Sequence, residues 1–186
     1  ASVLAFIENH DTDRFLGEGD NLPMLKQAST LLLTTRRIPQ LYYGTEVMMN
    51  GVKSKSDGYV RKDFPGGWTG DATNALTPAG RTKIQNECYD FYKTILNWRK
   101  GNDVIAKGNM VQFMVQNGVY AYARQYEGKT VFVMLNGTDA ETTVPLKFYK
   151  EILKNSKQGK DILSGKAITF GEELKMGPRE SLVIEL

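Results

Sequence analysis

The sequence has little of the chemistry that holds metals or disulfides. It contains one cysteine, Cys88, and one histidine, His10, among 186 residues. A single cysteine excludes an internal disulfide, and one cysteine with one histidine cannot supply a structural zinc site. We therefore predict that this segment binds no cofactor.

Charge of one sign and long apolar runs are also scarce. The 24 basic and 21 acidic residues leave a formal net charge of +3, and no block of five or six like charges occurs. This balance predicts no nucleic-acid partner. No apolar stretch approaches the roughly 20 residues that span a bilayer, so we predict no membrane partner. With 41% hydrophobic residues, the chain can bury the core of one domain or of two small ones.

The first half of the chain alternates between strand, loop and helix patterns. Apolar runs over residues 3–7 and 38–43 are typical of strands buried on both faces of a parallel sheet. Apolar residues recur at helical spacing over residues 22–36 and 78–100, and Thr77 is the expected N-terminal cap of the second helix. This order predicts an α/β fold.

After Gly101 the pattern changes to short strands. Hairpin dipeptides separate runs of β-branched and aromatic residues. The predicted strands are residues 110–117, 119–126, 129–136, 142–148, 161–163, 167–170, 173–175 and 181–185. We predict an antiparallel β-sandwich over residues 102–186.

Two polar loops follow the predicted parallel strands. The first, residues 8–14, reads Glu-Asn-His-Asp-Thr-Asp-Arg and holds the only histidine. The second, residues 44–76, is longer than most loops without a function. In a barrel, loops at the carboxyl ends of strands face the active site. Taken alone, the first loop also fits a structural interpretation, in which its polar side chains cap their own backbone.

In order along the chain, several segments resemble the α-amylase family. Residues 6–15 resemble the family motif in which an Asn-His-Asp run follows the seventh barrel strand, and residues 38–46 resemble the eighth strand with its Gly-x-Glu ending. Residues 61–68, Arg-Lys-Asp-Phe-Pro-Gly-Gly-Trp, and the Trp-Arg-Lys at 98–100 are similar to the neopullulanase and cyclomaltodextrinase branch. The resemblance covers residues 1–136, and the tail fits the family's C-terminal domain more loosely.

This resemblance implies a fold and an activity. Residues 1–101 would be the C-terminal portion of a catalytic (β/α)8 TIM barrel, with its last two strands and helices, and residues 102–186 a C-terminal all-β domain. The parent would be a retaining α-glucan hydrolase of neopullulanase, cyclomaltodextrinase or α-amylase type. The family's nucleophile and general acid stand on earlier barrel strands that are missing here, so we expect the fragment to be inactive alone.

The resemblance also implies partners. The parent would bind α-glucan oligosaccharides or polysaccharides and lie in the periplasm. The resemblance leaves open whether the parent holds a calcium ion. Barrel strands without their neighbours expose backbone edges, which predicts self-association of the fragment.

Carried over residue by residue, the family motif gives roles to the first loop. Asp11 matches the carboxylate that stabilises the transition state, and His10 matches the histidine that binds the same sugar. An oxocarbenium-like transition state gains from hydrogen bonds that strengthen as positive charge develops, and a carboxylate is a strong acceptor. Asn9 and Arg14 are candidates for substrate binding; Asn9 could instead orient the loop, and Arg14 could instead pair with Asp13.

The second loop supplies further candidates. Glu46 could touch sugar or pair with a neighbouring arginine. Trp68, with Phe64 and Tyr59, could stack on glucose rings, and the alternative is packing within the loop. A different function also remains open, namely a non-catalytic carbohydrate-binding or scaffolding β-domain that uses Trp68.

Overall fold

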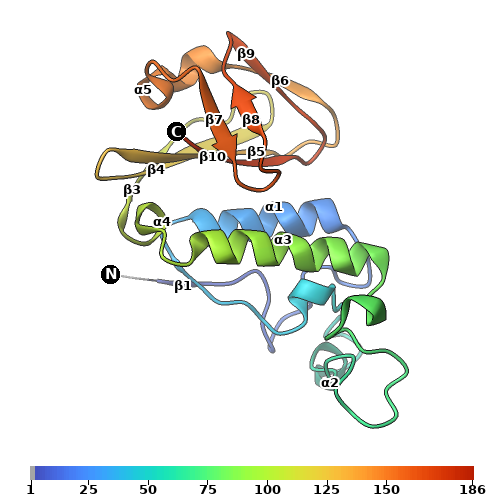
Figure 1. The fold of residues 1–186 in the computed structure, drawn as a ribbon. Helices are drawn as coiled ribbons and strands as arrows, with labels where there is room; N and C mark the ends of the chain where they lie inside the picture. The colour runs from blue at the N-terminus through green and yellow to red at the C-terminus, as the bar shows by residue number, and fades with distance from the viewer. Residues whose placement is uncertain (1–2) are drawn as a thin grey trace. The chain divides into compact units, whose positions relative to one another are not determined.

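A computed structural model describes residues 3–186, and the chain divides into two compact units (Figure 1). The first unit contains the residues up to Leu32 together with Arg37–Lys93. The second contains Leu33–Arg36 and Thr94–Leu186. The division cuts through two helices, whose last residues belong to the second unit, so the domain boundary at residue 101 stays a prediction.

The first unit contains a strand–helix–strand arrangement. Strands β1 and β2 pair in parallel, with Leu4 opposite Ile38, and helix α1 connects them. The elements are β1 (Leu4–Ala5), α1 (Leu22–Thr34), β2 (Ile38–Pro39), the short helices η1 (Thr45–Val47), α2 (Asp57–Val60) and η2 (Pro78–Gly80), and the long helix α3 (Lys83–Arg99).

The parallel strands are shorter and more exposed than the sequence predicts. Two residues each are paired, where we expected 3–7 and 38–43. Leu4 is 54% exposed and Ile38 is 52% exposed, so the prediction of burial on both faces is wrong for this structure. The reason is that, among residues 3–186, the sheet consists of these two strands only, and no third strand lies beside either of them.

Both long helices form where apolar spacing predicts them, but α3 begins later. Thr77 accepts a hydrogen bond from the Gly80 amide (3.3 Å), yet it caps only the short turn η2. The α-helix starts after Thr82, whose amide donates to Gln85 Oε1 (2.9 Å) while its hydroxyl accepts from the Gln85 amide (3.3 Å). This reciprocal capping box fixes the helix start.

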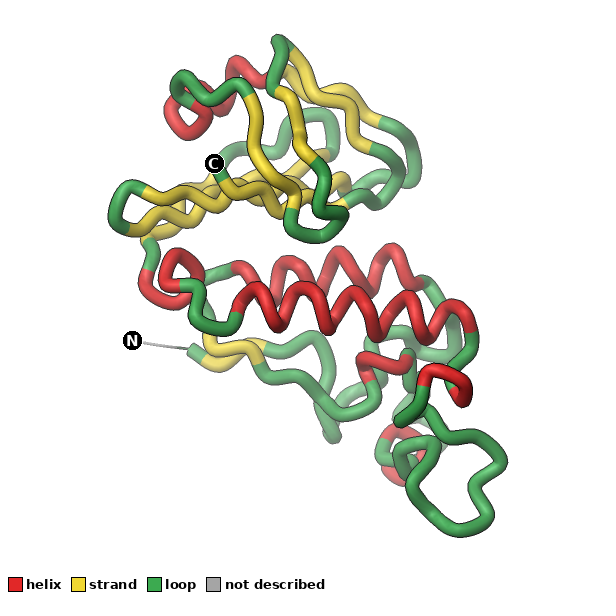
Figure 2. Tube along the Cα trace, in the orientation of Figure 1, coloured by secondary structure: helices red, strands yellow, loops and turns green. Residues whose placement is uncertain are grey.

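The second unit is mostly antiparallel sheet (Figure 2). One sheet has six strands in the order β3-β4-β5-β10-β7-β8, and a second sheet pairs β6 with β9. The strands are β3 (Asn109–Gln112), β4 (Val119–Tyr126), β5 (Lys129–Asn136), β6 (Thr142–Pro145), β7 (Gln158–Asp161), β8 (Ala167–Thr169), β9 (Glu173–Met176) and β10 (Ser181–Glu185). Helix α4 (Asp103–Lys107) precedes them, and η3 (Leu146–Tyr149) with α5 (Lys150–Leu153) follows β6.

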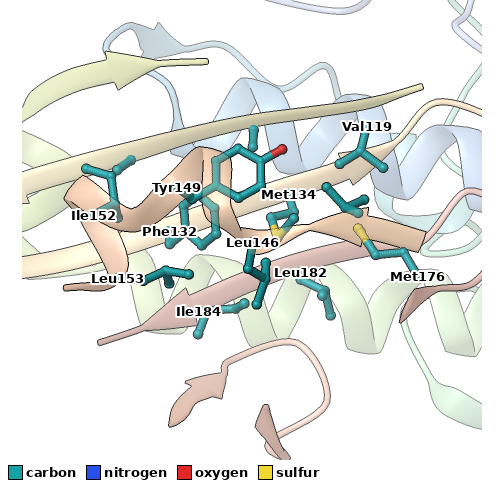
Figure 3. Packing of buried hydrophobic residues seen from close by; sticks show 13 residues of the cluster. Val119, Phe132, Met134, Leu146, Tyr149, Ile152, Leu153, Met176, Leu182 and Ile184 are labelled. Carbon is teal, nitrogen blue, oxygen red and sulfur yellow. The ribbon is translucent and has the colours of Figure 1, made fainter. Parts of the chain in front are cut away.

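Period-two alternation along β5 builds a core on each face of the large sheet. Phe132 and Met134 point to one face, where they pack with Val144 of β6 and Met176 of β9 (Figure 3). Val133 and its neighbours point to the opposite face and pack with α4. Alternate residues of a strand reach opposite faces, which is why one hydrophobic strand serves both cores.

One buried arginine links the large sheet to backbone carbonyls of neighbouring segments. Arg124 of β4 is fully buried and donates to the carbonyls of Thr34 (2.8 Å), Ile105 (2.9 Å) and Gly108 (2.8 Å). A guanidinium has five donors in a fixed fork, so it can satisfy several backbone carbonyls at once.

None of the helices formed by residues 3–186 is long and apolar enough to cross a membrane.

Candidate active-site loops

Two polar loops leave the same edge of the β1–β2 pair. Because the strands are parallel, residues 6–15 and residues 40–46 both start at carboxyl ends of strands. The Thr45 hydroxyl donates to the Glu8 carboxylate, and Arg14 Nη1 donates to the Tyr43 carbonyl (2.7 Å). The loop with the Asn-His-Asp run and the segment with Glu46 therefore lie side by side.

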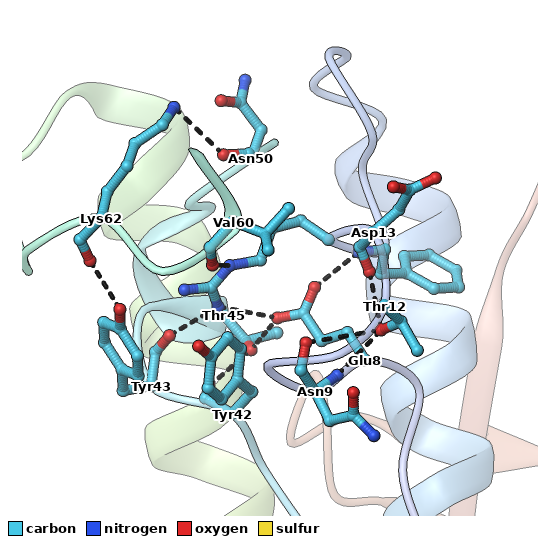
Figure 4. A network of polar contacts seen from close by, with 12 residues as sticks. Glu8, Asn9, Thr12, Asp13, Tyr42, Tyr43, Thr45, Asn50, Val60 and Lys62 are labelled. Carbon is cyan, nitrogen blue, oxygen red and sulfur yellow. Dashed lines mark hydrogen bonds and ion pairs between the residues drawn. The ribbon is translucent and has the colours of Figure 1, made fainter. Parts of the chain in front are cut away.

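A buried carboxylate and a buried guanidinium support these loops (Figure 4). Glu8 is 2% exposed and Arg14 is 1% exposed. Arg14 Nη1 lies 3.3 Å from Glu8 Oε1, and Glu8 Oε2 accepts from the Phe15 amide at 2.5 Å. Arg14 Nε also donates to the Val60 carbonyl (3.0 Å). These bonds join both loops to α2.

Arg14 lies among aromatic rings rather than at the surface. Its guanidinium carbon is 4.0 Å from the centre of the Tyr42 ring and 4.9 Å from that of Tyr43. Burial, followed by a side-chain hydrogen bond with Tyr43, raises the pKa of Tyr42. The ion pair of Arg14 is with Glu8, while Asp13 Oδ1 accepts from the Lys53 amide (2.5 Å). The Asp13–Arg14 pair considered from the sequence is therefore wrong.

Above this support, His10 and Asp11 are open to solvent. Their side chains are 59% and 60% exposed, and His10 Nε2 lies 3.1 Å from Asp11 Oδ2. Arg61 holds the pair from the long loop, because its Nη2 lies 3.1 Å from Asp11 Oδ1 and its Nε donates to the His10 carbonyl (2.9 Å). The arrangement presents a carboxylate, an imidazole and a guanidinium together, which suits a polyhydroxylated ligand.

Asn9 shapes the turn between the buried and exposed groups. Its Oδ1 accepts from the Asp11 amide (2.7 Å), and its own amide donates to Thr12 Oγ1 (3.0 Å). An asparagine that bonds to the backbone two residues on stabilises a tight turn. The geometry thus gives Asn9 a positioning role.

Glu46 and Trp68 stand apart from this cluster in different ways. Glu46 lies in η1 between the buried residues Thr45 and Val47. Trp68 is 70% exposed, and its amide donates to Asp71 Oδ2 (3.0 Å). Packing within the loop therefore does not cover the indole.

Sequence reasoning missed Glu8, Thr45 and Arg61. Nothing in their spacing signals a contact, since Arg61 is 50 residues from Asp11 and Thr45 is 37 residues from Glu8. For Arg61 a hint existed, because it opens the segment 61–68 that resembles one branch of the family.

Within residues 3–186, no group of three or more His, Cys, Asp or Glu side chains could hold a metal ion.

A parallel strand pair with polar loops at its carboxyl edge, followed by an antiparallel β-domain, is an arrangement of α/β enzymes whose sites lie at strand ends. Comparison with known proteins agrees with this class. Residues 110–185 match the family of cyclo-maltodextrinase C-terminal domains. The chain is 31% identical to an α-amylase of Niallia circulans over 90% of its length, and 31% identical to a cyclomaltodextrin glucanotransferase of Thermoanaerobacterium thermosulfurigenes over 95%.

Solved structures share the fold. An α-amylase from Geobacillus thermoleovorans, in complex with acarbose, matches 99% of this chain with a TM-score of 0.75 and 22% identity. The protein AmyP, in complex with maltose, matches 100% with a TM-score of 0.77 and 17% identity. The chain covers 38% and 41% of those structures, and 29% and 22% of the two sequence relatives. The chain is therefore similar to enzymes of the α-amylase family over nearly its whole length, and residues 110–185 match the C-terminal domain of cyclo-maltodextrinases.

Proposed function

We propose that this chain is the C-terminal part of a retaining α-glucan hydrolase. Residues 1–101 would complete its TIM barrel as the seventh and eighth strands with their helices, and residues 102–186 would form its C-terminal domain. The observation that supports this most is the parallel β1–β2 pair, which sends residues 6–15 and 40–46 out of the same edge. That edge is where barrel enzymes place their sites.

In this proposal Asp11 stabilises the transition state and His10 binds the same sugar. Both side chains are exposed, as binding a sugar from solution requires. Arg61 orients the Asp11 carboxylate through their contact at 3.1 Å. The buried pair of Glu8 and Arg14 holds residues 6–15 in place, so Arg14 acts as a positioning residue.

The chemistry of bond cleavage needs more than these residues. A retaining glycosidase uses a nucleophilic carboxylate and a carboxylic acid about 5–5.5 Å apart. We propose that both come from a preceding part of the enzyme. The 186-residue chain should then release no reducing sugar from pullulan, cyclodextrin or starch, and release that survives repurification would contradict the proposal.

A non-catalytic carbohydrate-binding or scaffolding domain is the second candidate, and the exposure of Trp68 favours it. The reading frame that encodes this chain separates the two. Upstream Arg-x-Asp and Glu segments, in barrel-strand context, are expected for the hydrolase. A complete reading frame without them would leave only the binding function.

A further inference from the structure

The second unit contains a groove that lies outside the candidate active-site loops. Its volume is about 610 Å³, within the range of ligand sites. The groove lies where the end of α3, the start of α4, the β4–β5 turn and the end of β10 meet. Its lining includes Trp98, Asn102, Tyr126, Lys129 and Glu185, all from the second unit.

Two aromatic side chains line this groove. Trp98 and Tyr126 are both half-buried and pack against the core on the α4 side of the sheet. A hydrogen bond from Trp98 Nε1 to Glu185 Oε1 (2.7 Å) fixes the indole. Lys107 Nζ lies 5.6 Å from the centre of the Tyr126 ring. Aromatic faces held in place are suitable surfaces for the apolar face of a sugar ring.

The charges around the groove favour a neutral ligand. Both signs are interspersed, and Asp103 already pairs with Lys107 (3.1 Å). The charged lining residues are Lys100, Asp103, Glu127, Lys129 and Glu185. A phosphate or another anion would meet carboxylates here, whereas hydroxyl groups can donate to the carboxylates and accept from the lysines.

We propose that this groove is a second α-glucan-binding site, which takes a malto-oligosaccharide segment between Trp98 and Tyr126. The assignment to α-glucans rests on the proposed function, and the neutral, hydroxyl-rich chemistry follows from the lining. The site does not depend on the proposed catalytic role of Asp11, because no residue of the loop 6–15 lines the groove.

The two tryptophans allow a direct test. Trp68→Phe leaves Trp98 as the single tryptophan, so fluorescence reports on the groove alone. Titration with maltoheptaose should change the emission in a saturable way and protect Trp98 from acrylamide quenching. In this background Tyr126→Ala should weaken binding about five- to tenfold, since it removes one stacking surface.

Matched controls identify the site and the ligand class. Phe148→Ala removes another exposed aromatic of the same unit, outside the groove, and should leave binding unchanged. Asp11→Asn should also leave it unchanged. Absence of a saturable signal, a Tyr126→Ala variant that is folded and binds as before, or loss of the signal in Asp11→Asn would each overturn the proposal. Equal binding of cellohexaose would overturn the assignment to α-glucans.

Discussion

Substitution of the buried Glu8 carboxylate tests how the candidate active-site loops are held in place. Glu8→Gln keeps the size of the side chain but removes the charge that faces Arg14, which is 1% exposed. Breaking a buried pair by removing one partner costs about 3–5 kcal/mol. The glutamine carbonyl can still accept one of the bonds from Thr45, Phe15 and Arg14, so we expect a loss of about 3 kcal/mol in the free energy of unfolding.

Urea unfolding followed by tryptophan fluorescence measures this loss. Glu87→Gln is the matched control, because Glu87 is 57% exposed and pairs with Lys26 at 2.7 Å in the same unit. A surface pair of this kind contributes at most about 1 kcal/mol. If the two variants lose the same free energy of unfolding, the buried Glu8 carboxylate does not support the loops in the way described.

Further expectations concern other parts of the chain. Burial raises the pKa of the Cys88 thiol to about 12, so at pH 8 only about one thiol in 10⁴ is ionised. A thiol reagent should therefore react quickly with Cys88 only after unfolding. Fast reaction of the native chain would contradict this expectation. Arg124→Lys cannot reach the carbonyls of Thr34, Ile105 and Gly108 at once and should cost about 2–3 kcal/mol of stability in thermal unfolding. A loss below about 0.5 kcal/mol, on the order of a surface change, would refute this role. We also propose that the chain self-associates through the exposed β1–β2 pair, and light scattering that shows a monomer at high concentration would exclude it.

The β-domain was largely predictable from the sequence. Residues 119–126, 129–136 and 181–185 form strands with the predicted ends. Hairpin dipeptides and β-branched runs are local signals, and here local preference and tertiary packing agree. The predicted start of the second long helix was wrong because two capping signals lie close together. Thr77 has the sequence of a helix cap, but the capping box of Thr82 and Gln85 starts α3.

The candidate active-site loops were predictable only in part. The motif pointed to His10 and Asp11, and the structure places both side chains in solvent beside each other. The support beneath them was not visible, because the contacts of Glu8 with Thr45 and of Asp11 with Arg61 join residues far apart in the chain. Such pairs depend on how the loops leave the parallel strands, which sequence patterns do not encode.

The measurement that tests the central claim most directly is the kinetics of Asp11→Asn in the longer enzyme that we propose contains this chain. The substitution removes the charge that favours a developing oxocarbenium ion but leaves a neutral ground-state sugar bound, so kcat should fall about 10²- to 10⁴-fold with little change in KM. Asp20→Asn, an exposed change outside the network, should leave turnover nearly intact. A folded Asp11→Asn enzyme with kcat within about tenfold of the parent, a difference of only ~1.4 kcal/mol, would contradict the assignment.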